Sequence, residues 1–159
     1  MKKSLKRRRL EGKTDYSARL ALLKAGKTRL VLRRSNKYII AQLIVSEYAQ
    51  DRVLAQAISS ELLNKGWPSE LQGSLKSRAA SYLTGFLLVS KLNGSIAEAI
   101  LDIGMHRNIH KSRLYAALKG ALDAGLHVYG SADILPSMEM IEGDSKLHKV
   151  FKLIMEKLK

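Results

Sequence analysis

The stretch RLVLRRSNKYIIAQLIVSEYAQDRVLAQAI, residues 29–58, decides the fold of this chain. Its first six residues alternate in character and end at Ser35-Asn36-Lys37, a triplet that is typical of turns. A run rich in β-branched residues follows over Tyr38–Ser46, and a third run covers Asp51–Ile58 after a short polar link. Three consecutive strands joined by short links predict an antiparallel meander.

Alternation along the strands predicts what each face of this sheet carries. On the first strand Leu30 and Leu32 point one way, whereas Arg29, Val31 and Arg33 point the other way. The second strand is largely apolar on both faces, and polar groups gather near the first turn. We therefore expect a sheet that is covered over much of both sides and has one hydrated basic corner.

Helices and one more strand are expected around the meander. A short helix over Ser17–Ala25 precedes it, and a buried strand over Ala97–Ile103 comes later. Ser112 opens a helix that runs through Ala124. A long helix is expected from about residue 74 to residue 92, with an inward face made of Leu75, Ala79, Tyr82, Leu83, Phe86 and Ser90. The predicted fold class is mixed α/β, in which a three-stranded antiparallel meander is extended by the later strand through a crossover and is flanked by helices.

The chain is predicted to have three parts. Its 159 residues suffice for one domain and an arm. Residues 1–25 are expected to form a basic arm, which is extended over 1–15 and ends in the short helix. Residues 26–142 form the α/β body, and residues 143–159 form a C-terminal amphipathic helix. That helix either closes over the sheet of the body or docks on a partner, and the pattern leaves both open.

Positive charge is concentrated at the front of the chain. Residues 1–37 hold fourteen basic and two acidic side chains, a net charge of +12 out of +14 for the whole chain. Such a block repels itself and needs an anionic partner. Nucleic acid is the polyanion best able to absorb it, because each neutralised phosphate releases a counterion.

A merely solvated tail is the alternative reading of this charge. Against it, the charges continue to Lys37 and are interleaved with Tyr16, Asn36, Tyr38 and Gln42, which suit unpaired bases. RNA is favoured over DNA, because no recognition helix or paired half-site pattern appears.

Composition argues against several other classes of protein. The chain has no cysteine, so a disulfide framework and a thiolate metal site are excluded. Its apolar runs are too short to cross a bilayer, and no apolar stretch follows the basic N-terminus as it would in a secretory signal. Phosphate-binding loops, dinucleotide fingerprints and nucleophile elbows are missing from the sequence. We expect no cofactor, no small-molecule substrate and no membrane partner.

Two pairs of residues have a spacing that could serve a metal. His106 and His110 lie four residues apart, but the residues between and before them indicate a loop, so we expect no metal there. Glu98 and Asp102 share one face of a strand, whereas a two-metal nuclease needs several converging carboxylates. Asp102 is therefore expected to be a buried hydrogen-bonded or ion-paired group. A metal-dependent nuclease and a general nucleic-acid chaperone remain as rival hypotheses.

Longer motifs carry a resemblance to a known family. The segment RRRLEGKTDYSARLALLKAGKTRLVLRRSNKYIIAQLI, residues 7–44, resembles the start of the "eighteen" family of large-subunit ribosomal proteins, in its archaeal and eukaryotic branch. The likeness covers about residues 7–142 and continues in order through SSELLNKGW (59–67), AASYLTGFLL (79–88), EAILDIGM (98–105) and SRLYAALKGALDAGL (112–126). One departure is Lys111, which stands where members of this branch often carry glycine.

The resemblance implies a non-catalytic structural protein of the cytoplasmic ribosome. It implies binding to 5S rRNA, attachment of that RNA to 23S rRNA in the central protuberance, and a neighbouring ribosomal protein of the "five" family. It also implies that the arm and the sheet corner grip the RNA. Carried over by position, the RNA-binding residues are Arg7, Arg8, Arg9, Lys13, Thr14, Tyr16, Arg19, Arg29, Arg33, Ser35, Asn36, Lys37, Tyr38, Gln42, Ser112 and Arg113.

Overall fold

A five-stranded sheet of order β3-β2-β1-β4-β5 forms the centre of the computed structural model, which describes residues 4–47, 50–92, 98–129, 132–143 and 145–158. β1 (Arg29–Arg34), β2 (Ile39–Glu47) and β3 (Gln50–Ile58) pair antiparallel. β4 (Glu98–Asp102) and β5 (His127–Val128) extend the sheet in parallel. The predicted meander, the crossover to a later strand and the mixed α/β class are confirmed. β5 was not expected, because two residues are too few to show an alternation.

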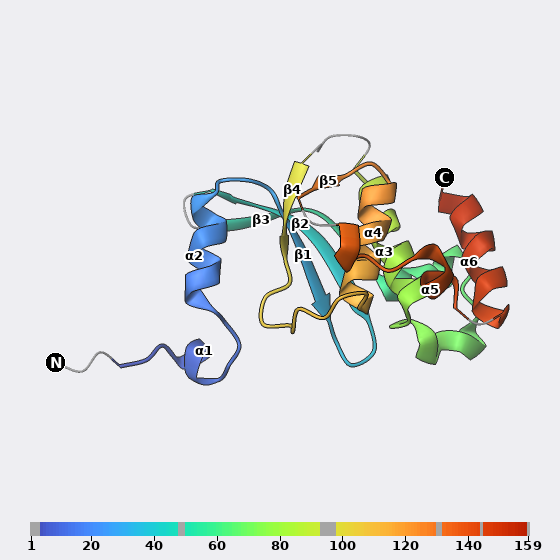
Figure 1. The fold of residues 1–159 in the computed structure, drawn as a ribbon, viewed down its shortest axis with the longest axis horizontal. Helices are drawn as coiled ribbons and strands as arrows, with labels where there is room; N and C mark the ends of the chain where they lie inside the picture. The colour runs from blue at the N-terminus through green and yellow to red at the C-terminus, as the bar shows by residue number, and fades with distance from the viewer. Residues whose placement is uncertain (1–3, 48–49, 93–97, 130–131, 144, 159) are drawn as a thin grey trace.

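Helices lie on both sides of this sheet (Figure 1). α3, α4 and α6 lie on one side, and α1 and α2 lie on the other. Within the described residues no helix has the length and apolarity needed to cross a membrane. The α-helices are α1 (Arg7–Leu10), α2 (Tyr16–Lys24), α3 (Arg78–Ser90), α4 (Arg113–Asp123), α5 (Met138–Glu142) and α6 (Ser145–Leu158), and 3-10 turns cover Ser59–Lys65, Ser69–Ser74 and Ala132–Ile134.

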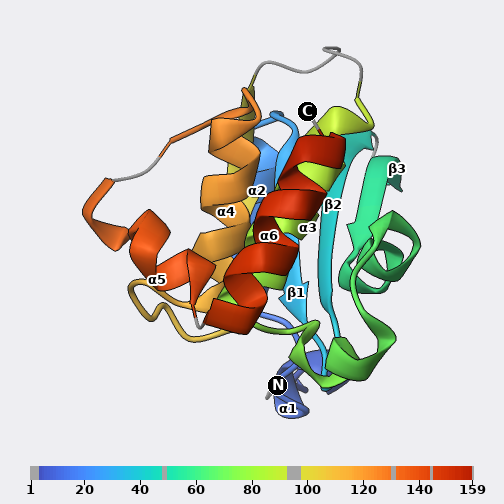
Figure 2. The same cartoon turned by 90° about the vertical axis from the view of Figure 1, so that its right-hand side faces the viewer.

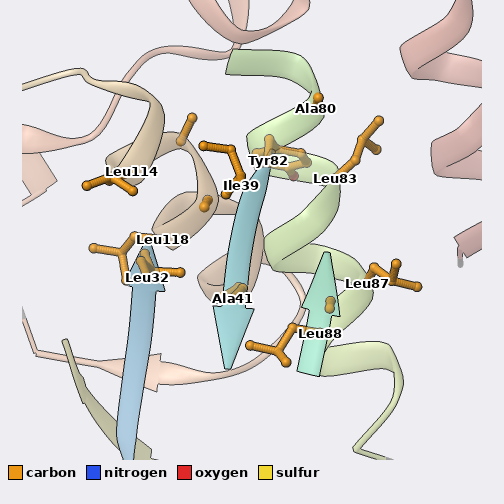
Figure 3. Close-up of a cluster of buried hydrophobic side chains, with 14 of the residues drawn as sticks. Leu32, Ile39, Ala41, Ala80, Tyr82, Leu83, Leu87, Leu88, Leu114 and Leu118 are labelled. Atoms are coloured by element: carbon orange, nitrogen blue, oxygen red, sulfur yellow. The ribbon is translucent and has the colours of Figure 1, made fainter. Parts of the chain in front are cut away.

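The core lies between the sheet and the layer formed by α3 and α4 (Figure 3). Leu30 and Leu32 of β1 are fully buried there, as their alternation predicted. Leu83 and Leu88 of α3 and Leu118 of α4 pack into the same cluster. The sheet thus contributes one apolar face to the core, and the hydrophobic effect determines that this face is the one turned towards α3 and α4.

α3 departs from its predicted bounds and its predicted face. It begins at Arg78 because the Ser77 side chain accepts the Ala80 N–H at 3.2 Å and caps the helix. Ser90 is exposed and Phe86 is only half-buried, whereas Leu87 and Leu88 are buried. The predicted inward face is therefore confirmed for Leu75, Ala79, Tyr82 and Leu83 and is wrong for Phe86 and Ser90. α3 packs against α4, α6 and the strands β2 and β3, so it is covered on more than one side.

α6 packs on α3 and closes the helical side of the molecule (Figure 2). Its Phe151 and Ile154 are buried, and the Phe151 ring lies 5.4 Å from the Tyr82 ring. The Tyr82 hydroxyl donates to Asp123 at 2.8 Å, and burial together with this carboxylate raises the pKa of Tyr82. The sequence left open whether this helix closes over the body or docks on a partner, and in the structure it packs on the body. It covers α3, however, and does not lie directly on the sheet.

The front of the chain differs from the extended arm that was predicted for residues 1–15. Arg7–Leu10 form a short helix, and Asp15 caps α2 by accepting the N–H groups of Ser17 and Ala18 at 2.9 and 3.2 Å. Neither α1 nor α2 has a buried residue. On the second face of the sheet Arg29, Val31 and Ile44 are nevertheless buried, whereas Val53 on β3 is exposed, so this face is covered over part of its width only.

Candidate nucleic-acid interface

The polar face of the sheet holds an ion-pair network centred on the buried side chains of Arg29 and Asp102. The Arg29 side chain is 3% exposed, and one of its nitrogens donates to Asp102 Oδ2 at 3.3 Å. Its other terminal nitrogen donates to Asp51 Oδ1 and to the Ser46 hydroxyl, both at 2.8 Å. Arg19 reaches Asp51 Oδ2 from α2 at 3.1 Å. Burial raises the pKa of Asp51, but the Ser46 hydrogen bond and the charges of Arg29 and Arg19 outweigh it and lower that pKa below its usual value.

Arg33 completes this network on the other oxygen of Asp102. It donates to Asp102 Oδ1 at 2.8 Å and to the Asp102 carbonyl at 2.6 Å. The Gly104 N–H donates to the same Oδ1 at 2.8 Å. Gly104 has a φ of +58°, and a Cβ there would lie 2.9 Å from Cζ of Arg33. A glycine is therefore needed where the chain turns against this guanidinium.

Asp102 is thus the buried ion-paired group that the sequence predicted. Arg29 differs from the RNA-contacting role carried over to it, because its guanidinium is buried and is surrounded by Asp51, Asp102 and Ser46. Its charge is satisfied inside the protein and does not face a surface phosphate. No local pattern around Arg29 predicts this burial, because Asp102 lies seventy-three positions away along the chain.

Substituting Asp102→Asn is expected to lower the free energy of unfolding by about 2 kcal/mol. The substitution removes the charge that Arg29 and Arg33 share, while Arg29 keeps Asp51. Urea unfolding of the two proteins measures the difference. Asp133→Asn is the matched control, because Asp133 is exposed and has no ion pair among the described residues. Equal losses in both variants would contradict a structural role for Asp102.

The arm carries exposed cations that are only loosely tied to one another. Arg7 and Lys13 both reach Glu11, at 2.7 and 2.8 Å, and these two contacts lower the pKa of that carboxyl, with Lys13 the larger cause. Arg8 donates to the Thr14 hydroxyl at 3.0 Å. These are surface contacts, which contribute little to stability. Arg9 is exposed and forms no ion pair within the described residues.

Tyr16 begins α2 and lies beneath Lys6, whose Nζ is 4.4 Å from the ring centroid. A cleft of about 470 Å³ separates α2 from the sheet, and residues of the arm line it together with Arg33, Gly104 and Met105. Arg8, Lys13, Thr14 and Arg19 of the predicted set line this cleft, and the helices α1 and α2 that carry the arm lie at the same end of the molecule (Figure 1).

The first turn uses several of its predicted contacts internally. The Ser35 hydroxyl accepts the Tyr38 N–H at 2.9 Å and donates to the Tyr38 carbonyl at 3.0 Å. The Gln42 amide donates to Gln56 at 2.7 Å. The side chains of Asn36 and Lys37 are exposed at the tip. The turn thus presents an amide and a cation, and its serine serves the turn itself.

A second cationic surface adjoins the cleft beneath α2 at Met105, and we name it the α3/α4 depression. It is a hollow of about 780 Å³ between the end of β1, the loop that follows β4, and the starts of α3 and α4. Ser112 and Arg113 of the predicted set line it, together with Lys111, the residue that departs from the glycine common in the family; Arg34, Arg78 and Arg107 were not predicted. Its lining consists of Arg34, Ser77, Arg78, Met105, His106, Arg107, Ile109, His110, Lys111, Ser112, Arg113 and Leu114.

His106 belongs to this depression as a hydrogen-bond acceptor. Its Nε2 accepts the backbone N–H of Arg34 at 3.2 Å. Burial, with the charges of Arg33 and Arg34, lowers the pKa of His106 below its usual value. The arginines and the lysine of the lining supply positive charge to the depression.

The described residues offer no metal centre. No three His, Asp or Glu side chains among them converge as a metal ion requires. Glu98 is exposed and lies 3.5 Å from Lys27, and both oxygens of Asp102 are occupied by arginines. Glu98 and Asp102, the two carboxylates of the nuclease hypothesis, thus both form ion pairs within the protein.

Comparisons with known proteins agree with one another. A family model described as "Ribosomal large subunit proteins 60S L5, and 50S L18" matches residues 2–97. A "Large ribosomal subunit protein uL18" from Korarchaeum cryptofilum is 51% identical over 139 residues, covering 87% of this chain and 69% of the relative. The protein of that name from Methanoculleus marisnigri is 49% identical over 138 residues, covering 86% and 77%. The one from Methanothermobacter thermautotrophicus is 42% identical over 154 residues, covering 96% and 78%.

Proposed function

The chain belongs to the uL18 family of large-subunit ribosomal proteins, and from this premise we propose that it binds 5S rRNA and helps to attach it to 23S rRNA in the central protuberance. It is a structural, RNA-binding component of the large subunit of the cytoplasmic ribosome and serves translation. This family is not one of enzymes, so the nuclease hypothesis is dropped. A protein of the "five" family is its proposed neighbour.

One observation carries the proposal. α1 and α2 bury no side chain, yet residues 1–20 hold eight basic side chains and two acidic ones. Stability of the body does not account for so much charge, because exposed cations without buried partners contribute little to folding. Binding to RNA does account for this charge, because each phosphate that a cation neutralises releases a counterion and so adds to the affinity.

Not all of the sixteen predicted contacts are proposed to touch RNA. Arg29 supports the sheet from inside, and Arg33, Ser35 and Gln42 are engaged in hydrogen bonds within the protein. We propose that phosphate contacts supply most of the affinity and that the Tyr16 and Tyr38 rings and the Asn36 amide add contacts to unpaired bases and 2′-hydroxyls. The proposed RNA-binding residues are Arg7, Arg8, Arg9, Lys13, Thr14, Tyr16, Arg19, Asn36, Lys37, Tyr38, Ser112 and Arg113.

A gel-shift titration tests the proposal directly. We expect 5S rRNA to bind at least about tenfold more tightly than tRNA or duplex DNA at the same salt concentration, because base and 2′-hydroxyl contacts add to a shared phosphate term. The logarithm of the affinity should fall linearly with the logarithm of the salt concentration, with a slope that corresponds to roughly six to ten phosphates. Equal affinity for the three nucleic acids would favour the chaperone hypothesis and contradict this one.

A further inference from the structure

The cations of the α3/α4 depression differ from those of the sheet network in having no acidic partner. Arg29 and Arg33 are ion-paired to aspartates. Arg34, Arg78, Arg107, Lys111 and Arg113 form no ion pair within the described residues, and the lining of the depression includes no acidic side chain. Like charges around one hollow repel each other, so this arrangement costs stability unless an anion occupies it.

Lys111 adds a second cost at the same place. Among the described residues it is the one non-glycine side chain with a positive φ, at +56°. Its N–H donates to the Ile134 carbonyl at 2.9 Å, which holds the backbone in this conformation, while its side chain is exposed and lines the depression. The left-handed region disfavours a residue with a Cβ and suits glycine. No contact of the Lys111 side chain among the described residues stabilises the fold. The side chain does, however, add one more cation to the depression.

We propose that the α3/α4 depression binds the phosphodiester backbone of the RNA at a place separate from the arm, and that Lys111 is a phosphate-binding residue there. This inference rests on the proposed function and deepens it by adding a second contact surface. Met105 lines both the depression and the cleft beneath α2, so the two surfaces adjoin at this exposed residue. One RNA backbone can therefore pass from the arm to the depression without leaving the protein.

The position of the depression beside the arm favours RNA phosphates over other anions as its occupants. Arginine presents a planar fork that matches two phosphate oxygens, and four arginines line the depression together with the lysine. His106 accepts the backbone N–H of Arg34 and so holds the main chain of this arginine at the edge of the depression. An acidic protein segment is the other conceivable occupant, and the experiment below distinguishes the two.

Three substitutions at Lys111 separate binding from folding. Lys111→Gly removes both the cation and the backbone strain. Because the cation is lost, we expect RNA affinity to fall about three- to tenfold. Because the strain is lost, we expect Tm to rise by roughly 2–4 °C. Lys111→Ala loses the cation and keeps the strain, which predicts the same loss of affinity with a Tm below that of Lys111→Gly. Lys111→Arg keeps both and should match the native chain. Lys149→Ala on α6 is the control, because Lys149 is an exposed lysine without an ion pair among the described residues.

Affinity is measured for 5S rRNA and for poly(U), because a phosphate contact is made with either RNA. We expect the Gly and Ala variants to lose affinity for both probes, with a salt slope smaller by about 0.7–0.9. Combining Lys111→Gly with neutralisation of Arg7, Arg8 and Arg9 should add the two losses, because separate phosphates are involved.

The possible failures are distinguishable. Unchanged affinity for both RNAs in Lys111→Gly and Lys111→Ala would overturn the inference and leave 5S binding by the native chain intact, and it would favour an acidic protein segment as the occupant. If the native chain bound poly(U) as tightly as 5S rRNA, the proposed function would be overturned. The affinities of the Lys111 variants for poly(U) would then still test the inference. Binding to neither RNA would overturn both.

Discussion

Deletion of residues 1–20 is expected to weaken the binding of 5S rRNA by about a hundredfold or more at physiological salt. The deleted segment contains eight basic side chains against two acidic ones, so most of the phosphate contacts proposed for the arm are lost with it. The slope of log affinity against log salt concentration should become smaller by roughly four or more, because each phosphate contact contributes close to one unit to that slope. Filter binding over a range of salt concentrations measures both quantities.

The same deletion is expected to leave the body folded. α1 has no buried residue, the deleted part of α2 has none, and its longest-range ion pair joins Arg19 to Asp51 on the surface. An exposed pair of this kind contributes at most about 1 kcal/mol. Circular dichroism and the thermal unfolding curve should therefore change little. A deletion that unfolds the body would show that residues 1–20 are a structural segment and not an RNA-binding arm.

A matched pair of triple variants separates position from charge. Arg7→Gln, Arg8→Gln and Arg9→Gln remove three exposed cations from α1, and Lys65→Gln, Lys149→Gln and Lys152→Gln remove three exposed cations near α6. α1 and α6 lie at opposite ends of the molecule (Figure 1). We expect only the first variant to lose RNA affinity. An equal loss in both would mean that net charge alone, and not the arm, draws the RNA.

Gly85→Ala and Gly120→Ala are each expected to lower the free energy of unfolding by about 3 kcal/mol. α3 and α4 cross so closely that a Cβ on Gly85 would lie 1.9 Å from the Ala117 carbonyl oxygen, and a Cβ on Gly120 would lie 2.0 Å from the Tyr82 carbonyl oxygen. Both obstacles are backbone atoms, so the helices must move apart. Alanine is the better helix former by about 1 kcal/mol, but this gain is smaller than the cost of separating two packed helices.

Thermal unfolding measures this cost, and the expected fall in Tm is roughly 6–12 °C. Gly73→Ala is the control, because a Cβ on Gly73 meets no atom within 4 Å. The double variant should cost less than the sum of the single ones, since one separation of the helices relieves both clashes. If Gly85→Ala and Gly120→Ala were as stable as Gly73→Ala, the close crossing of α3 and α4 would be contradicted.

Local patterns predicted the strands well and the helices less well. β1, β2 and β3 lie within a residue or so of the predicted runs, because a turn-prone triplet and alternation are local signals. α3 was predicted four residues too early and with too narrow a buried face, because Ser77 caps it and other elements cover it on several sides. α1 was missed altogether, since four residues carry no periodicity.

The candidate site shows the same division. The order of charges along residues 1–37 predicted a polyanion as the partner, and the quoted motifs predicted the family that the comparisons then showed. The α3/α4 depression was only partly found, through Ser112 and Arg113. Arg34, Arg78 and Arg107 come from three distant segments, so neither spacing nor charge density along the chain brings them together.

By itself, the sequence determined the meander, the crossover strand, the family and the anionic nature of the partner, because each of these follows from short-range order along the chain. Tertiary structure alone decided which cations remain available to that partner. Burial and pairing depend on residues that meet across the sheet, and thus Arg29 is enclosed by Asp51 and Asp102 while Lys111 and its neighbouring arginines stay without an acidic partner among the described residues.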